Sequence, residues 1–178
     1  DVYGVYIAGS VDGNSTNTGG ISANGNSGQG YGVYISNSAG NFTNSGNLTG
    51  GYYGAYIGSD LNGNFANSGD IRGTKYYGVE IYGSLNGDFA NSGNITGGYY
   101  GVYVGSNVVG NFTNEGRIEG LNRQYGVYIE SNLAGDFINT GDIVADSVDG
   151  MNVYIGGDFG GNLTHTAGQG VSVGGDAN

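Results

Sequence analysis

The sequence predicts an all-β fold: a parallel β-helix of about seven coils, with three short strands per coil. One observation is a segment of the type Tyr-Gly-Val-Tyr-Ile that returns after intervals of 22 to 28 residues. A second is the distance of 18 residues, in five copies, from the opening tyrosine to a late isoleucine. A third is the presence of 41 Gly with no Pro and no Cys in 178 residues, which excludes collagen and a disulfide scaffold. We therefore expect a single domain over residues 1–178, with coils starting near residues 3, 31, 53, 77, 100, 125 and 151.

The opening segment is predicted to be the first strand of each coil, because it is short, β-branched and aromatic. Strand alternation places Val5 and Ile7 on the inner face, and Gly4 and Tyr6 on the outer face. The turn that follows contains one apolar residue that is expected to point into the core. These residues are Val11, Leu61, Leu85, Val108, Leu133 and Phe159.

The second strand is predicted around a motif of the type Asn-Phe-Thr-Asn. Its aromatic residue should face the core, as Phe42, Phe65, Phe89, Phe112 and Phe137, with Leu163 in the last coil. The next Asn has the same parity and should form an inward amide ladder of Asn17, Asn44, Asn67, Asn91, Asn114 and Asn139. Ser15 and His165 take the Phe and Asn positions in the terminal coils.

The third strand is predicted around the late Ile or Leu, between a glycine turn and a corner of variable length. Glycines two residues after each ladder Asn, such as Gly69 and Gly93, are expected to have positive φ. The corners are expected to be exposed loops over one face, at residues 22–30, 72–76, 119–124 and 144–150.

The charge of the chain disfavours nucleic acid as a partner. The net charge is −11, and the chain has only four Lys and Arg residues, which are Arg72, Lys75, Arg117 and Arg123. Phosphate binding needs clustered Lys and Arg, so we expect neither nucleic acid nor an anionic lipid surface to bind. No apolar run reaches the length of a membrane-spanning helix, so no membrane insertion by this segment is expected. No signal segment opens the chain, which starts almost inside a repeat, so we expect a processed product or a piece of a longer protein.

The run GNFTNSGNLTGGYYGAYIG resembles the N-x-G-x-I-x-G repeats of bacterial autotransporter passenger domains and related secreted adhesins. The resemblance extends from Tyr3 to about Leu163. It implies a right-handed parallel β-helix, secretion to the cell surface, and a role in adhesion, biofilm formation or self-association. It fits either a passenger segment or a free-standing filament subunit.

The sequence contains no recognisable catalytic or metal-binding set. His165 is the only histidine and Cys is absent, so no nucleophile–base pair can be assigned. The acidic residues are scattered over turns and strands instead of being grouped as in β-helical lyases and glycosidases. We therefore expect a protein that is not an enzyme and that needs no cofactor or metal. Ice binding by an outer Thr column is disfavoured because Ala66, Ala90 and Ile138 interrupt that column.

Tyrosines form the candidate contact surface. Six are expected to point outward from the first strand in consecutive coils, interrupted by Glu80, and three more precede them on the same side. The predicted surface is Tyr6, Tyr34, Tyr52, Tyr56, Tyr76, Tyr99, Tyr103, Tyr128 and Tyr154. Between these rings we expect a stripe of outward glycines, which would make a shallow aromatic groove. The tyrosines can either stack on one another for stability or contact a glycan or a neighbouring protein.

Together with these observations, the resemblance to secreted adhesins implies an extracellular or cell-surface segment with a structural, adhesin-like role in cell-surface adhesion or self-association, end to end or lateral. Its partners would be a surface glycan, or a host or neighbouring protein. A first alternative is a self-assembling filament subunit whose coils stack end to end. A second is a carbohydrate-binding or carbohydrate-active β-helix, which a groove with clustered carboxylates would distinguish.

Overall fold

In the computed structural model, which describes residues 1–25, 29–122, 125–145, 151–165 and 170–175, the chain forms a β-helix built only from parallel strands. The first sheet contains β1 (Val2–Ile7), β4 (Gly30–Ile35), β7 (Tyr53–Ile57), β10 (Val79–Ile81), β13 (Val102–Val104), β16 (Val127–Ile129), β19 (Met151–Ile155) and β21 (Gly170–Val173). The second contains β2 (Ser15–Asn17), β5 (Phe42–Asn44), β8 (Phe65–Asn67), β11 (Phe89–Asn91), β14 (Phe112–Asn114), β17 (Phe137–Asn139) and β20 (Leu163–His165). The third contains β3 (Gly20–Ala23), β6 (Asn47–Gly50), β9 (Asp70–Gly73), β12 (Asn94–Gly97), β15 (Arg117–Gly120) and β18 (Asp142–Ala145).

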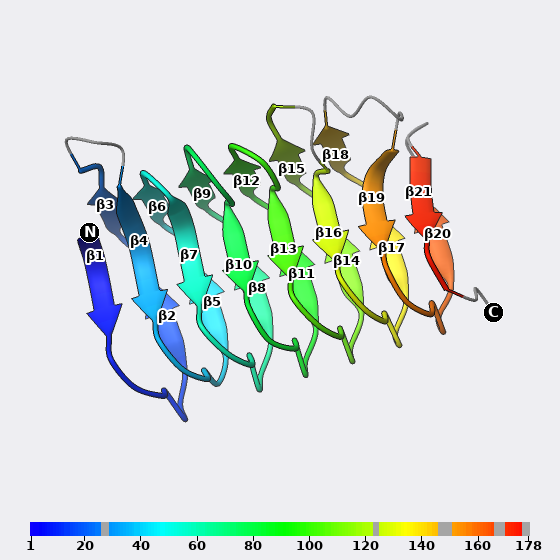
Figure 1. The fold of residues 1–178 in the computed structure, drawn as a ribbon, viewed down its shortest axis with the longest axis horizontal. Helices are drawn as coiled ribbons and strands as arrows, with labels where there is room; N and C mark the ends of the chain where they lie inside the picture. The colour runs from blue at the N-terminus through cyan, green and yellow to red at the C-terminus, as the bar shows by residue number, and fades with distance from the viewer. Residues whose placement is uncertain (26–28, 123–124, 146–150, 166–169, 176–178) are drawn as a thin grey trace.

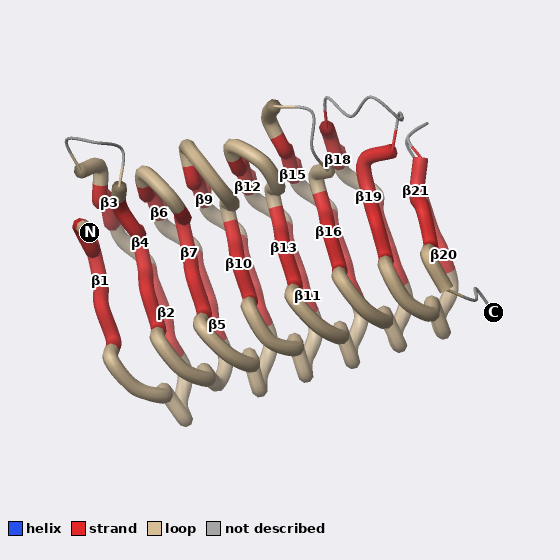
Figure 2. The backbone as a smooth tube through the Cα atoms, viewed as in Figure 1, coloured by secondary structure: helices blue, strands red, loops and turns tan. Residues whose placement is uncertain are grey.

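The coils wind in a right-handed sense. In Figure 1 the chain descends along the nearer sheet, ascends along the farther one, and advances from the N-terminus at the left to the C-terminus at the right. Six coils in the described part of the chain have all three strands, and β19 and β20 begin a seventh. The predicted parallel β-helix with three strands per coil is therefore confirmed. Figure 2 shows how short turns join the strands within each coil.

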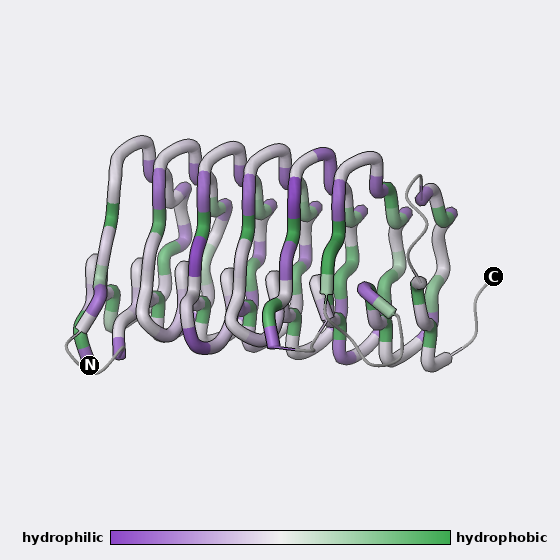
Figure 3. The backbone as a smooth tube through the Cα atoms, turned by 90° about the horizontal axis from the view of Figure 1, so that it is seen from above, coloured by the Kyte–Doolittle hydropathy of each residue, from purple (hydrophilic) through white to green (hydrophobic). Residues whose placement is uncertain are grey.

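Equivalent residues of successive coils lie in register. Phe89 pairs with Phe65 on one side and with Phe112 on the other. The five Phe rings of this column are stacked, with centroid distances from 4.4 to 5.3 Å. The predicted turn residues also stack, because Leu61, Leu85, Val108 and Leu133 follow one another through single bridges and are fully buried. As a result, hydrophobic segments recur at the same place in each coil (Figure 3).

The Phe column ends in an exposed residue at its C-terminal end. Leu163 takes the Phe position, as predicted, and pairs in register with Phe137, but it is 50% exposed. The reason is that β20 is the last strand of the second sheet in the described residues, so no further coil covers it there. At the other end Ser15 occupies the Phe position opposite Phe42, as predicted.

The glycines of the first strand face the core, and the expected outward glycine stripe is wrong. A Cβ added to Gly54 would lie 2.5 Å from Cγ2 of Ile71, and one added to Gly101 would lie 2.5 Å from Cγ2 of Ile118. The isoleucine of the third sheet therefore packs directly on the glycine backbone. The residue after each glycine, such as Val102, also faces inward and is fully buried. Two successive inward residues shift the alternation by one, as in a β-bulge.

The glycines of the second turn also serve close packing. A Cβ at Gly93 would lie 2.1 Å from the carbonyl oxygen of Gly69, and one at Gly116 would lie 2.1 Å from that of Gly93. Their φ angles lie outside the left-handed region, so the expected positive φ is wrong. Glycine is needed here because backbone stacks on backbone between coils.

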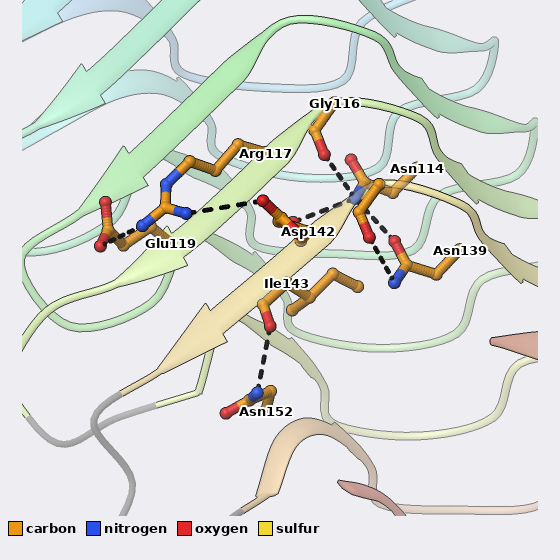
Figure 4. Close-up of polar contacts among 9 residues, drawn as sticks. Asn114, Gly116, Arg117, Glu119, Asn139, Asp142, Ile143 and Asn152 are labelled. Atoms are coloured by element: carbon orange, nitrogen blue, oxygen red, sulfur yellow. Dashed lines mark hydrogen bonds and ion pairs between the residues drawn. The ribbon is translucent and has the colours of Figure 1, made fainter. Parts of the chain in front are cut away.

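The predicted asparagine ladder is confirmed. The side-chain amide of Asn91 donates to Oδ1 of Asn114 at 2.8 Å and to the carbonyl oxygen of Gly93 at 2.9 Å. The same pair of bonds, to the next Asn and to the Gly two residues on, recurs from Asn17 to Asn114. Figure 4 shows the link between Asn114 and Asn139. In the seventh coil His165 takes the Asn position, and its Nδ1 lies 3.0 Å from Nδ2 of Asn139.

A second polar column lies outside the core, immediately before the Phe column. Oδ1 of each residue accepts the backbone N–H of its equivalent in the next coil, at 2.8 to 2.9 Å. The accepting residues are Asn41, Asn64, Asp88, Asn111 and Asp136. An acceptor is all that these bonds require, which explains why both Asn and Asp occur in this column while the inner ladder is Asn alone from Asn17 to Asn139.

The corners begin later than predicted. The third strands extend to Ala23, Gly73, Gly120 and Ala145, so the first two residues of each predicted corner belong to a strand. Residues 26–28, 123–124 and 146–150 of the predicted corners lie outside the described residues.

Candidate contact surface: a tyrosine layer around Glu80

The inward glycine decides where the tyrosines lie. Because both Gly54 and Ala55 face the core, Tyr53 and Tyr56 emerge on the same outer face, and their ring centroids are 5.3 Å apart. The same relation holds between Tyr100 and Tyr103, at 5.8 Å. The opening tyrosines, which the alternation pattern did not assign to the contact surface, therefore belong to it. The signal for this was the Tyr-Gly-x-Tyr spacing around a glycine.

Three columns of rings make up the tyrosine layer. The opening column is Tyr3, Tyr31, Tyr53, Tyr77, Tyr100 and Tyr125, the outer column is Tyr6, Tyr34, Tyr56, Tyr103, Tyr128 and Tyr154, and the corner column is Tyr52, Tyr76 and Tyr99. Ring contacts join all of them along the first sheet. The nine predicted tyrosines thus lie on one face together with the six of the opening column. Tyr82, 63% exposed, stands outside this network.

The layer also holds an ammonium group. Nζ of Lys75 lies 4.9 Å from the ring centroid of Tyr52 and 5.3 Å from that of Tyr76. A cation over an aromatic face is attracted by the ring quadrupole. The corner column is therefore already occupied by a cation from the chain itself.

Glu80 occupies the position of a tyrosine in the outer column. It pairs in register with Tyr56 on one side and Tyr103 on the other, yet it is only 6% exposed. The Tyr53 hydroxyl is a hydrogen-bond partner of its carboxyl group. The second oxygen, Oε2, is buried and has no hydrogen-bond partner. Ring contacts continue around this gap, because Tyr77 stacks on Tyr103 at 5.1 Å.

Burial under these rings changes the acidity of the site. Removal from water raises the pKa of Glu80 from its ordinary 4.5 to about 7, while the bond from Tyr53 opposes that shift. Burial and the nearby Glu80 carboxyl together raise the pKa of Tyr56 and of Tyr77 to about 12. The pKa of Tyr53 is raised further, chiefly by burial.

A second carboxyl group contacts the layer at Glu130, which follows β16. The hydroxyl of Tyr103 donates a short hydrogen bond to its Oε2. Unlike Glu80, Glu130 is exposed. The layer is therefore in contact with a buried carboxyl at Glu80 and with an exposed one at Glu130, two coils further along.

The other candidate chemistry of the sequence is not assembled into a site in the described residues. No group of three or more His, Asp or Glu there is placed to hold a metal ion. Nε2 of His165 is buried without a hydrogen-bond partner in the part of the chain that is described. No helix there has the length and apolar character to cross a membrane. Arg117, one of the four cations, is paired with Glu119 at 2.8 Å and with Asp142 at 3.8 Å (Figure 4).

Comparisons with protein-family models, with curated proteins and with solved structures gave no match to this chain.

Proposed function

We propose that the chain is an extracellular structural segment of the adhesin type, in which a rigid solenoid presents the tyrosine layer as a contact surface. The observation that supports this is the continuity of the layer, from Tyr3 in the first coil to Tyr154 in the seventh, on one face of the first sheet. Aromatic rings that are partly exposed commonly contribute to interfaces, because they bury a large area at a small cost in side-chain entropy. The partner would be a glycan or a neighbouring protein surface.

The charge of the chain and the build of the core fit this role. The net charge of −11 keeps the surface soluble and disfavours phosphate polymers. The stacked Phe and Asn columns hold the rings at a fixed repeat of about 4.8 Å. A surface with such a repeat suits a partner that is itself repetitive, such as a polysaccharide.

A cosedimentation assay tests the contact role. Insoluble cellulose, insoluble chitin and beads carrying the chain itself are the probes. The test variant combines Tyr34→Ala and Tyr128→Ala, and the matched control combines Thr43→Ala and Ile138→Ala, on the outer face of the second sheet in the same two coils. We expect the wild type and the control to bind at least one probe, and the tyrosine variant to lose most of that binding. Equal binding by both variants, or binding to no probe, contradicts the proposal.

The second candidate is end-to-end stacking into a filament, which the apolar surface of the first coil supports. Val2, Tyr3, Val5 and Tyr6 are 36 to 53% exposed there, and β1, β2 and β3 pair on one side only in the described residues. Such strand edges accept further strands. The negative charge should oppose association at low salt and permit it when salt screens the repulsion.

Sedimentation velocity and electron microscopy of the chain test the filament candidate. At high concentration we expect larger species in high salt than in low salt, and Val5→Asp should prevent their formation. A monomeric profile in both conditions contradicts this candidate and leaves the contact role untouched.

A further inference from the structure

We infer that the tyrosine layer contains, at Glu80, a binding site for a primary alkylammonium group. The inference rests on the proposed contact role of the layer and names the chemistry recognised at one point of it. The site consists of the carboxyl group of Glu80 and the rings of Tyr53, Tyr56, Tyr77 and Tyr103.

The first argument is the unused oxygen of Glu80. Buried polar atoms nearly always have a hydrogen-bond partner, and an orphaned one is costly. Oε2 of Glu80 has none, although the residue is only 6% exposed. No salt bridge reaches this carboxyl in the described part of the chain. A ligand with an N–H donor and a positive charge would satisfy the oxygen and neutralise the carboxylate.

The second argument is the missing ring. In the outer column Tyr34 and Tyr56 stack at 4.8 Å, and Tyr103 and Tyr128 stack at 5.7 Å. Glu80 interrupts the column between Tyr56 and Tyr103, which are therefore about two strand spacings, or about 9.6 Å, apart. Tyr77, which stacks on Tyr103 at 5.1 Å, and Tyr53, the hydrogen-bond partner of Glu80, lie beside this carboxyl. Aromatic rings around a carboxylate favour an organic cation.

The third argument is that the same layer already binds an ammonium group. Lys75 places its Nζ over Tyr52 and Tyr76, at 4.9 and 5.3 Å from the ring centroids. The chemistry of ring and ammonium is therefore present in the corner column, which the opening column separates from the interruption. At Glu80 a carboxyl group accompanies the rings. This position should therefore bind a cation more strongly than the position that Lys75 occupies.

The orphaned oxygen requires an ammonium group with an N–H, and a primary ammonium offers three such donors. A quaternary ammonium would contact the rings but cannot donate a hydrogen bond to Oε2. A neutral alcohol can donate but carries no charge to offset the ionised carboxyl. Entry requires one of the covering rings to swing outward, and all four are partly exposed surface side chains. The ammonium can come from a free amine or from a lysine side chain of a partner protein.

Titration of the chain with n-butylammonium, followed by NMR of the tyrosine rings, tests the inference at pH 8. Tetramethylammonium and 1-butanol are the probes that each lack one required property, and N-acetyl-lysine methylamide represents a protein lysine. We expect saturable shifts with the two primary ammonium probes, and at least tenfold weaker responses with the other two. The stronger of the two ammonium responses distinguishes a free amine from a lysine side chain.

Two variants of Glu80 keep the test interpretable. Glu80→Gln keeps the shape of the side chain but removes its charge, and Glu80→Tyr restores the residue that occupies this column in other coils. Both should fold and lose at least tenfold in affinity for n-butylammonium, whereas Glu115→Gln, at an exposed acid of the second turn, should lose little. The affinity of the wild type should also fall as the pH is lowered from 8 to 5, because burial keeps the pKa of Glu80 at about 7.

Several results would overturn the inference. One is an equal response of the wild type and both Glu80 variants, which would indicate general attraction to the acidic surface. Another is an equal response to n-butylammonium and 1-butanol, which would indicate contact with the rings alone. Loss of the ammonium response with retained polysaccharide binding would refute this site and leave the proposed contact role standing.

Discussion

Asn91 and Asn114 lie in adjacent coils, and the amide nitrogen of Asn91 donates to the side-chain oxygen of Asn114 at 2.8 Å inside the core. Both protons of the Asn91 amide are used, since the other is donated to the Gly93 carbonyl at 2.9 Å. Its own oxygen accepts from Asn67 at 2.7 Å. The position therefore requires a donor and an acceptor on the same side chain, which among small residues Asn supplies.

Asn91→Asp should lower the free energy of unfolding by about 3 kcal/mol or more at pH 7, because a carboxylate removes two donors and places a charge beside a buried acceptor. The matched control is Asn64→Asp, in the outer polar column, where Asp88 and Asp136 already occupy equivalent positions. That change should cost less than about 0.5 kcal/mol. Urea unfolding of both variants measures the difference, and similar losses would show that the two columns are not chemically distinct.

Phe89→Ala should lower the free energy of unfolding by about 3–5 kcal/mol, because it opens a cavity in a fully buried stack. The ring lies between Phe65 and Phe112, at centroid distances of 4.9 and 4.4 Å. Ser15→Ala, at the same position in the first coil, should cost little. Thermal unfolding monitored by circular dichroism compares the two, and equal shifts in Tm would contradict the inward stack.

Gly101→Ala should lower the free energy of unfolding by about 2 kcal/mol or more, because the new methyl group would lie 2.5 Å from Cγ2 of Ile118 and 2.8 Å from the Gly126 oxygen. The control is Gly13→Ala, where nothing lies within 4 Å of the added Cβ. Differential scanning calorimetry should show a large fall in Tm for the first variant only. A tolerated Gly101→Ala would mean that this glycine faces outward, as the alternation of the sequence suggested.

Glu80 should make the protein less stable as the pH rises. Its pKa is about 7 in the folded chain against an ordinary 4.5, so between these values the folded state binds more protons than the unfolded state. Stability from this group is full below about pH 4.5, falls through the interval, and is lower by about 3 kcal/mol above pH 7. Urea midpoints measured from pH 4 to pH 8 should show this fall in the wild type, and Glu80→Gln should remove it. Parallel curves for the two proteins would place Glu80 in water.

Most of the fold could be predicted because the same sequence pattern recurs in every coil of a solenoid. The Phe and Asn columns follow from period-two alternation on a short strand, and each coil tests that register again. The inward glycine could not be predicted in this way, because strand alternation assigns one face per residue and Gly54 and Ala55 share the inner face. The reason lies in packing across the core, where Cγ2 of Ile71 comes within 2.5 Å of the Cβ position of Gly54.

The same limit explains what was missed in the tyrosine layer. The outer column was identified from alternation, whereas Tyr53 and Tyr77 of the opening column depend on the bulge that the glycine produces. The burial of Glu80 depends in turn on these opening rings, since the Tyr53 hydroxyl is its hydrogen-bond partner. A sequence pattern shows that Glu80 replaces a tyrosine, but only the three-dimensional arrangement shows that the carboxyl group is covered.

The direction of the hydrogen bonds has a mechanical consequence. The strand-to-strand bonds and the Asn ladder run from coil to coil along the axis, and the first and last coils lie at opposite ends of it (Figure 1). A force that pulls these ends apart therefore loads one coil boundary after another, and the outermost coil should peel away first. Each coil of roughly 24 residues would then release about 80 Å of extended chain. Under tension the molecule should lengthen in steps of nearly equal size and act as an extensible tether.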